Sequence, residues 1–482
     1  MATQQESGPT RASGAQSNRS ISQWAGFLYS IGAITTFYLA YSSRFLSVLI
    51  VVYLFCLVRM ARLPTARQAF YLGLATGVLT AVPQLYCFWT IFGPGAIVLW
   101  LVLGFWIGLF VALARWCRIR FAPWTPLLVP VLWTGLEYFR SELYYLRFSW
   151  LNVGYAFADN MPMPLFHILG MYGIGFVAAA IASAAADFRL VYIRPMAIAL
   201  SILLGTALLL GSRQIRARTD EPVAKTVAVA GAQMEFPTEN EVMLELGKVI
   251  EKTPEAQLLV LSEYTFTDPV PEKVKAWCRD HRRYLIVGGK DPTSDGNFYD
   301  TAFVVGPSGE IVFQQAKSVP IQFFKDGLPA QSQTLWDSPW GRIGLCVCYD
   351  LSYTRVTDGL VRLGAQAIIV PTMDAADWGL RQHQLHARVA PVRAAEYGIP
   401  IFRVASSGIS QLVDRTGVEL ERAGFPGDGE ILGGDLQLSQ YGSRPPDRWL
   451  APICVWATGI FCIYSLISNW LPFSRNPKSA II

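Results

Sequence analysis

The sequence is poor in charged residues and in histidine. Only 16% of its 482 residues are Asp, Glu, Lys or Arg, and there are four histidines. Soluble domains carry about a quarter charged residues. The shortage of charge, together with a hydrophobic content of 52%, indicates that much of the chain lies in lipid. A net charge of +5 is too small to indicate a partner by itself.

Several sequence motifs are missing. The eight cysteines form no CxxC pair and no regular Cys/His spacing, so we expect neither a disulfide framework nor a zinc site. A GxSxG elbow is absent, and no P-loop or GxGxxG opens a βαβ unit, which argues against a serine hydrolase and against nucleotide use. His383 and His386 lack the HExxH pattern, so we favour a structural role for them. We expect no metal and no cofactor.

Long apolar runs fill the first 211 residues. Each is roughly 20 residues long, as a membrane-spanning helix requires. We place them near 24–42, 44–60, 69–92, 95–115, 122–139, 162–185 and 196–211, with an eighth near 450–471. The polar segment 1–22 is predicted to be a disordered cytoplasmic N-terminus without a cleavable signal peptide.

Arginines in the short loops predict the orientation. They follow the second, fourth and sixth apolar runs, whereas the loop after the third, "FGPGA", is uncharged. Since Lys and Arg stay on the cytoplasmic side, both termini are predicted to be cytoplasmic. The prediction is therefore a transmembrane region at 23–212 with seven spans, an outside domain at 220–442, a last span at 448–472 and a cytoplasmic tail at 473–482.

Between residues 226 and 440 the pattern changes to short β-branched runs bounded by Gly and Pro. Examples are "TVAVAGAQ", "AQLLVLSE", "YLIVGG", "RIGLCVCYD" and "AQAIIVP", while "GPSG" and "DRTG" read as hairpin turns. Amphipathic stretches such as "ENEVMLELGKVIEKT" and "RQHQLHARVAPVRAAEYG" lie between some of them. This alternation predicts a layered α/β domain that is large enough to fold as a unit.

Three ionisable residues follow predicted strands of this domain. They are Glu263 in "LLVLSEYTF", Lys317 in "EIVFQQAKSVP" and Cys348 in "RIGLCVCYD". Taken singly, each has an ordinary explanation: a solvated strand cap, a surface charge and a packing thiol. Taken together, they provide a nucleophile, a base and a cation, which is the set needed for acyl transfer through a thioester.

The order Glu, Lys, Cys at these strand ends resembles the nitrilase (carbon–nitrogen hydrolase) superfamily. With the apolar runs, the chain is similar to the bacterial apolipoprotein N-acyltransferases, and "RFSWLNVGYAF" and the stretch 370–417 match as well. The resemblance implies an α-helical transmembrane bundle of about eight helices plus an extracytoplasmic α/β nitrilase-like α-β-β-α sandwich. It places the protein in the bacterial inner membrane as a multi-pass protein whose catalytic domain faces the periplasm.

The resemblance also assigns residues. It implies that Glu263 is the general base, that Lys317 stabilises the oxyanion and the thiolate, and that Cys348 is the nucleophile. Cys348 is preferred over Cys346 because only Cys348 precedes a tyrosine and an acid, and Cys346 is then a packing residue. Four further residues are implied to bind or support substrate: Tyr349, Asp350, Trp150 and Asn152.

The sequence departs from the family pattern near the lysine. Phe323 occupies the place of a glutamate that usually follows it, and whether Asp326 substitutes is left open. Asp350 also replaces a more usual glutamate. Glu137 and His167 lie in or near apolar runs, where an ionisable group is a functional candidate. For Glu137, a place at the membrane interface beside Arg140 is an equal alternative.

The implied reaction is ping-pong N-acylation. A phospholipid donates an acyl chain to the cysteine, and the N-terminal diacylglyceryl-cysteine of an apolipoprotein accepts it. The expected enzyme is a monomer that binds membrane and no nucleic acid, and the aromatic stretch "YYLRFSWLNVGY" is a candidate lipid entrance. Two alternatives stay open: a membrane-tethered nitrilase-type amidase acting on a small substrate, and a degenerate member that serves as a scaffold.

Overall fold

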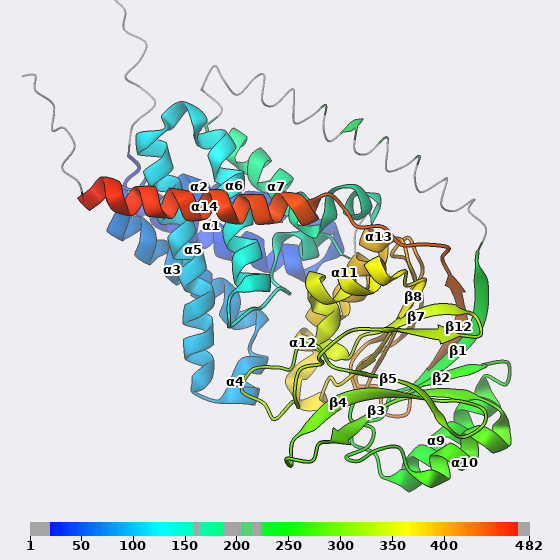
Figure 1. Cartoon of the computed structure of the whole chain (residues 1–482). Helices are drawn as coiled ribbons and strands as arrows, with labels where there is room; N and C mark the ends of the chain where they lie inside the picture. Colours follow the sequence, from blue (N-terminus) through cyan, green and yellow to red (C-terminus); the bar gives the residue numbers. More distant parts are fainter. Residues whose placement is uncertain are drawn as a thin grey trace, which may run out of the picture.

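The computed structural model describes residues 20–158, 163–187 and 223–470, with isolated positions between 202 and 213. Helices from both ends of the chain form one region, and strands with their covering helices form a second region beside it (Figure 1). The predicted seventh span, most of the N-terminal segment and the C-terminal tail lie outside the described residues.

In the part of the chain that the structure describes, the helical region contains seven α-helices from the N-terminal half and one from the end. They are α1 (Gln23–Ser42), α2 (Leu49–Met60), α3 (Ala66–Gln84), α4 (Cys87–Phe92), α5 (Gly95–Arg120), α6 (Thr125–Tyr138), α7 (Met163–Ala186) and α14 (Asp447–Trp470). Caps fix some of their starts, since Ser22 accepts from the Ala25 N–H and Thr65 forms a capping box with Gln68. The run predicted at 69–92 is split, because α3 ends at Gln84 and α4 begins at Cys87.

Small residues allow α3 and α5 to pack closely. A Cβ atom on Gly77 would lie 2.7 Å from the Cα of Gly104, and one on Gly73 would lie 2.9 Å from the Cα of Gly108. Such small-residue contacts are typical of helices that associate in a membrane, where close backbone approach replaces the hydrophobic effect.

Three of the described helices are long and apolar enough to cross a membrane. They comprise Gly95–Arg120, Leu165–Ala186 and Asp447–Ile467, and α2 is a shorter apolar helix. The region is therefore compatible with a membrane location, and the full count of eight spans stays a prediction. In Figure 1, α14 runs across the other helices of this region, and a Cβ on Gly135 of α6 would touch its Cys454 and Thr458.

The second region is built on two six-stranded sheets. The first has the order β12-β1-β2-β3-β4-β5, and the second has the order β11-β10-β9-β8-β7-β6. The first sheet contains β1 (Lys225–Ala232), β2 (Leu258–Val260), β3 (Tyr284–Pro292), β4 (Phe298–Val305), β5 (Ile311–Ala316) and β12 (Ile431–Leu438). The second contains β6 (Leu335–Ser338), β7 (Gly341–Leu345), β8 (Ala367–Thr372), β9 (Ile401–Ala405), β10 (Ser410–Val413) and β11 (Glu419–Ala423).

Helices cover the outer faces of both sheets. On the first sheet, α9 (Glu239–Lys252) and α10 (Glu272–His281) bury Val242, Leu246 and Val274 against its strands. On the second lie α11 (Thr354–Leu363), α12 (Gly379–Ala387) and α13 (Val389–Tyr397), which face the helical region (Figure 1). The predicted α-β-β-α order of layers is therefore present, and the stretch predicted as one helix after residue 380 forms two.

The parallel strands determine where the candidate site residues lie. β1, β2 and β3 run parallel in one sheet, and β7, β8 and β9 run parallel in the other. In sheets of this kind the residues that follow the carboxyl ends of the strands form the ligand-binding crevice. Glu263 follows β2, Cys348 follows β7 and Met373 follows β8.

Candidate active site

Glu263, Lys317 and Cys348 line one cavity of about 440 Å³. The Lys317 ammonium donates to Oε1 of Glu263 at 2.7 Å, and its side chain is fully buried. The second oxygen, Oε2, accepts from the backbone N–H of Met373 at 2.6 Å. Both carboxylate oxygens of Glu263 are thus fixed, which orients this group beside the thiol.

Cys348 lies beyond the end of a strand, at the start of a short helix. β7 ends at Leu345, and Cys348 begins a short 3-10 helix, Cys348–Ser352, with a left-handed φ of 50°. Such a backbone conformation is costly for a residue with a Cβ and persists only where the surroundings impose it. Its Sγ donates to the carbonyl oxygen of Met373 at 3.6 Å.

Asp350 fastens this helix to the loop that holds Lys317. Its carboxylate accepts from the N–H of Ser318 at 2.9 Å, of Val319 at 2.7 Å and of Val347 at 3.4 Å. Burial raises the pKa of Asp350 to about 6, although these N–H groups and Lys317 oppose the shift. This predicted support residue therefore bridges the segments that contain Cys348 and Lys317 without lining the cavity.

Two more carboxyl groups surround Lys317. Oδ2 of Asp326 lies 2.7 Å from its Nζ atom, and Oδ2 of Asp300 lies 3.3 Å from it. Asp326 is held in turn by the Tyr264 hydroxyl at 2.8 Å and the Ile321 N–H at 2.6 Å. Carboxylate oxygens of Glu263, Asp300 and Asp326 fall within 4.8 Å of one another, as in a metal site, but the ammonium of Lys317 contacts all three.

The charges of this cluster set its protonation. Burial alone would lower the pKa of Lys317, but the carboxylates of Glu263, Asp326 and Asp300 raise it well above the usual lysine range. Burial raises the pKa of Glu263, but the charge of Lys317 and hydrogen bonds from Lys317, Asp300 and Cys348 together outweigh burial, so that the net shift is downward. Burial and the charge of Glu263 together raise the pKa of Asp300 well above its usual range. The resting site therefore contains a Glu263–Lys317 ion pair.

The thiol of Cys348 is protonated in the resting site. Burial raises its pKa well above that of an ordinary cysteine, and the negative charge of Glu263 raises it further, while Lys317 opposes the shift. A thiol of this kind reacts only when a base takes its proton as the bond to the substrate forms. Glu263 is the adjacent carboxylate in the cavity.

A second cavity adjoins the first and is almost entirely apolar. It lies between α4, α5, the 146–150 stretch and the 321–324 loop, and we call it the apolar groove. Its lining residues are Cys87, Phe88, Ile91, Phe92, Leu99, Val102, Leu103, Leu146, Arg147, Phe148, Trp150, Ile321, Gln322, Phe323, Phe324, Tyr349, Trp378 and Gln382. Ile321, Phe324 and Trp378 line both cavities, so the groove and the compartment of the thiol share a wall.

Two family models match separate parts of this chain. A family model described as apolipoprotein N-acyltransferase N-terminal domain matches residues 25–184, and the carbon-nitrogen hydrolase model matches residues 226–445. An apolipoprotein N-acyltransferase of Nitrosomonas europaea is 23% identical over 399 residues, which cover 72% of this chain and 78% of the relative. The chain belongs to the apolipoprotein N-acyltransferase family of the nitrilase superfamily.

Other relatives share less of their length. The apolipoprotein N-acyltransferase of Geobacter metallireducens is 23% identical over 333 residues, 60% of this chain and 64% of the relative, so just under two thirds of that protein is matched. An omega-amidase of Mus musculus is 27% identical over 194 residues, 35% of this chain and 67% of the relative. The amidase similarity is thus confined to a smaller part of the chain.

The structure shows which residue substitutes for the glutamate that Phe323 replaces in the family pattern. Phe323 is 66% exposed with a φ of 70° and packs its ring against Phe92 of α4 at 6.2 Å. Asp326, three residues later, supplies the carboxylate that reaches Lys317. The sequence left this substitution open because the loop between residues 318 and 326 follows no periodic pattern that would show which side chain turns inward.

The predicted support residues divide into two groups. Trp150 and Tyr349 line the apolar groove, with their rings 5.6 Å apart, and Trp150 stacks on His386 at 4.5 Å. Asn152 belongs to neither cavity lining in the described part of the chain. Its Oδ1 accepts from Arg140 at 2.8 Å, and its carbonyl oxygen accepts from the Tyr41 hydroxyl at 2.6 Å, so it joins loop and helices.

The other candidate ionisable groups have structural contacts. Glu137 is buried, lies 3.9 Å from Arg140 and accepts from the Val153 N–H at 2.8 Å. The Nδ1 of His167 lies 2.9 Å from the carbonyl oxygen of Glu396.

The two histidines of "HQLH" both lie near one carboxylate. Nδ1 of His386 is 2.8 Å from Oδ1 of Asp374, whose other oxygen pairs with Arg403. The ring of His383 stacks on Phe425 at 4.3 Å.

Cys346, which was predicted to be a packing residue, is fully buried.

Sequence reasoning missed Asp300 and Met373 entirely. Asp300 lies within β4 and looks like an ordinary strand residue, and Met373 acts through its backbone, which no residue type reveals. The cue for Met373 was its position directly after the parallel strand β8, next to β7.

Proposed function

We propose that this protein transfers an acyl chain from a membrane phospholipid to the α-amine of an apolipoprotein's N-terminal diacylglyceryl-cysteine. The observation that supports this best is the apolar groove directly beside the cavity of Cys348, with Ile321, Phe324 and Trp378 in the linings of both. A site for a small, water-soluble substrate needs no such groove, whereas a fatty chain needs an apolar path that ends at the nucleophile.

The first half-reaction forms a thioester. Glu263 takes the thiol proton as Sγ of Cys348 attacks the ester carbonyl of the phospholipid. Lys317 stabilises the negative oxygen of the tetrahedral intermediate, together with backbone N–H groups. The intermediate then expels the lysophospholipid alkoxide, which receives the proton from Glu263. The acyl chain stays on sulfur.

The second half-reaction forms an amide. The α-amine of the acceptor attacks the thioester carbonyl, and Glu263 accepts the proton that the amine loses. The C–S bond breaks, and the thiolate of Cys348 regains a proton from Glu263. No oxidant, metal or nucleotide is needed for either step.

Lipid confinement explains the arrangement of the two regions. Drawing an acyl chain into water costs about 0.8 kcal/mol for each CH₂ group. A groove lined by α4 and α5 avoids this cost, since these elements belong to the helical region. We further propose the domain boundaries, the eight spans and the periplasmic orientation given by the loop arginines, so that donor and acceptor reach the site from the same leaflet.

The test is an acylation assay on the full-length protein in membranes. With a phospholipid alone, the protein should gain the mass of one acyl chain, labile to hydroxylamine and absent in Cys348→Ser. Addition of a diacylated lipopeptide should then release the adduct and give an N-acylated peptide. If no adduct forms, or if it forms equally in Cys348→Ser, the proposal is wrong.

The same assay distinguishes the proposed acyl transfer from the amidase alternative. If water resolved the thioester, the adduct would decay at the same rate with and without lipopeptide and would yield free fatty acid. A scaffold protein would give no adduct, and its Cys348→Ser variant would retain full function in cells.

A further inference from the structure

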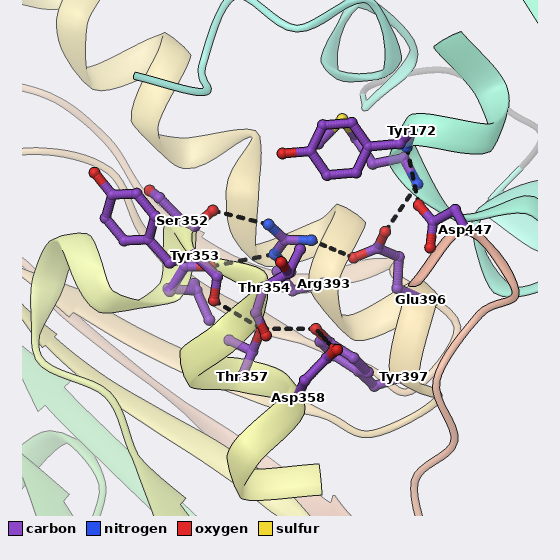
Figure 2. A network of polar contacts seen from close by, with 12 residues as sticks. Tyr172, Ser352, Tyr353, Thr354, Thr357, Asp358, Arg393, Glu396, Tyr397 and Asp447 are labelled. Carbon is purple, nitrogen blue, oxygen red and sulfur yellow. Dashed lines mark hydrogen bonds and ion pairs between the residues drawn. The ribbon is translucent and has the colours of Figure 1, made fainter. Parts of the chain in front are cut away.

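A buried polar network joins the nucleophile's helix to two helices of the helical region (Figure 2). At its centre is Arg393 on α13, which is fully buried. Its guanidinium donates to the carbonyl oxygen of Leu351 at 3.2 Å and of Ser352 at 2.8 Å. These carbonyls end the 3-10 helix that begins at Cys348, and the last carbonyls of a helix have no partner inside it. Arg393 therefore fixes the far end of the nucleophile's helix.

Glu396 connects Arg393 to the helices outside the α/β domain. It lies one turn further along α13 and accepts from Arg393 at 2.5 Å. The same oxygen accepts from Arg448 of α14 at 3.1 Å, and the other accepts from the Met171 N–H of α7 at 2.8 Å. The two guanidinium groups hold the pKa of Glu396 below its usual value in spite of burial, so the carboxylate is charged.

The contact with α7 depends on a break in that helix. Gly170 has a φ of 72°, and the break exposes the N–H groups of Met171 and Tyr172. Glu396 caps the first, and Asp447, the first residue of α14, caps the second at 3.0 Å. A Cβ on Gly170 would come within 2.2 Å of the Asp447 carboxylate, so the break and the cap require each other. Figure 2 shows Glu396 and Asp447 side by side beneath Tyr172.

A residue that lines the apolar groove, Trp150, also contacts the nucleophile's helix. Nε1 of Trp150 donates to the Ser352 hydroxyl at 2.9 Å. Ser352 thus receives Arg393 on its carbonyl and Trp150 on its side chain. Because the backbone of Cys348 is left-handed and strained, the helix that follows it needs such anchors to keep Sγ beside Glu263.

We propose that Arg393 is a positioning residue for Cys348, and that Glu396 couples it to α7 and α14, so that the acylation rate depends on how these helices dock. This rests on the acyl transfer proposed above. Arg393 touches no substrate and acts through Leu351 and Ser352. A misplacement of a reacting atom by about 1 Å costs on the order of 100-fold in rate, which gives small shifts of this helix a large effect.

The experiment compares Arg393→Gln with Arg388→Gln in the full-length protein. Arg388 is a matched control, because it is buried and also joins the two regions, through the carbonyl oxygens of Tyr41 and Tyr155, but it does not contact the nucleophile's helix. Two quantities are measured: the steady-state constants for acyl transfer, and the rate at which iodoacetamide labels Cys348, corrected with Cys348→Ser.

The expected result is a split between kcat and KM. For Arg393→Gln, kcat falls about 10- to 100-fold while KM for the phospholipid changes less than about twofold, because the groove is intact. Arg393→Lys, which keeps one cationic donor, recovers part of kcat. Labelling of Cys348 changes in Arg393→Gln and stays as in the wild type for Arg388→Gln.

Other outcomes overturn the proposal. Equal losses in both arginine variants would show that Arg393 only holds the regions together, and an unchanged labelling rate would show that the thiol has not moved. If Arg393→Gln does not fold, Glu396→Gln must show the same split in a folded protein. If the wild type forms no acyl adduct, the proposed function fails, but the labelling comparison still decides the positioning role, because it needs no lipid.

Discussion

Replacing Glu263 by Gln should separate two effects of one carboxylate. The variant keeps the size of the side chain but removes both the base and its negative charge. Loss of a general base typically costs 100- to 10,000-fold in rate, or about 3 to 5 kcal/mol of activation free energy. The same loss should lower the pKa of the Cys348 thiol, because the charge of Glu263 is, after burial, the main cause that raises it.

The cost in stability follows from the contacts. Both Glu263 oxygens accept from donors, Lys317 at 2.7 Å and the Met373 N–H at 2.6 Å. In the Gln variant an NH₂ group replaces one of these oxygens, so this NH₂ donor would point at one of the two donors. An unsatisfied buried donor costs about 1 to 3 kcal/mol. Lys317 keeps Asp326 at 2.7 Å, so its charge is still compensated and the domain should fold.

Two rates measured at the same pH should change in opposite directions in Glu263→Gln. Acyl transfer, which needs the base, should fall by at least about 100-fold in Glu263→Gln. Iodoacetamide labelling, which needs only thiolate, should accelerate near neutral pH, about tenfold for each unit by which the pKa falls. Glu263→Asp is the control, since it keeps the charge. If labelling slowed along with acyl transfer, Glu263 would not be the group that keeps the thiol protonated, and the electrostatic reasoning would be refuted.

Three further predictions test the cation's clamp, the support residue and the helix packing. In Asp326→Asn, Oδ1 can accept from Lys317 and the Ile321 N–H while Nδ2 faces the Tyr264 hydroxyl, so the protein should fold. We expect kcat to fall about 10- to 100-fold, because the charge-assisted bond to Lys317 is lost. A kcat within twofold of wild type would show that the charge is dispensable. The pKa of Asp350 is raised to about 6 in the folded protein, so its contribution of about 3 kcal/mol is fully present below pH 4 and is lost as pH rises through 6. Denaturant unfolding at pH 4 and pH 7 should show this loss in the wild type and not in Asp350→Asn, and an equal loss in both would contradict it. Gly77→Leu should separate α3 from α5 and lower the melting temperature in detergent, whereas the same change at exposed Gly459, where a Cβ meets nothing within 4 Å, should not.

Local sequence signals predicted much of the fold, because they depend on periodicity. The strands around Leu259, Ile286 and Ile369 are short apolar runs with clear boundaries, and α9 has a capping box at Thr238 and a strong amphipathic pattern. The exact end of β7 could not be read from the sequence, because "LCVC" continues the apolar pattern of the strand. The ladder in fact ends at Leu345, and Asp350 then turns the chain into a helix through its bonds to Ser318 and Val319.

The remaining part of the site comes from contacts that no periodic sequence pattern predicts. Lys317 meets Asp326 only because a nine-residue segment folds back on itself, and Trp150 meets Ser352 across 202 residues. No local preference encodes either distance. Family resemblance supplied the proposed roles of Cys348, Glu263 and Lys317, but it was least informative where this chain departs from the pattern, at Phe323 and Asp326.

Under the proposed mechanism, the cluster around Lys317 makes a buried, protonated thiol compatible with acyl transfer. An ammonium facing three carboxyl groups cannot hold a free thiolate strongly, because Glu263 and Asp326 already neutralise it. Such a site protects Cys348 from oxidation and stray electrophiles, since the thiolate is the reactive form. When a carbonyl lies beside Sγ, proton transfer to Glu263 neutralises that carboxylate and leaves Lys317 with less competition for the developing oxyanion. The positive charge thus becomes available at the moment when negative charge appears on the substrate, and stabilisation is specific to the transition state.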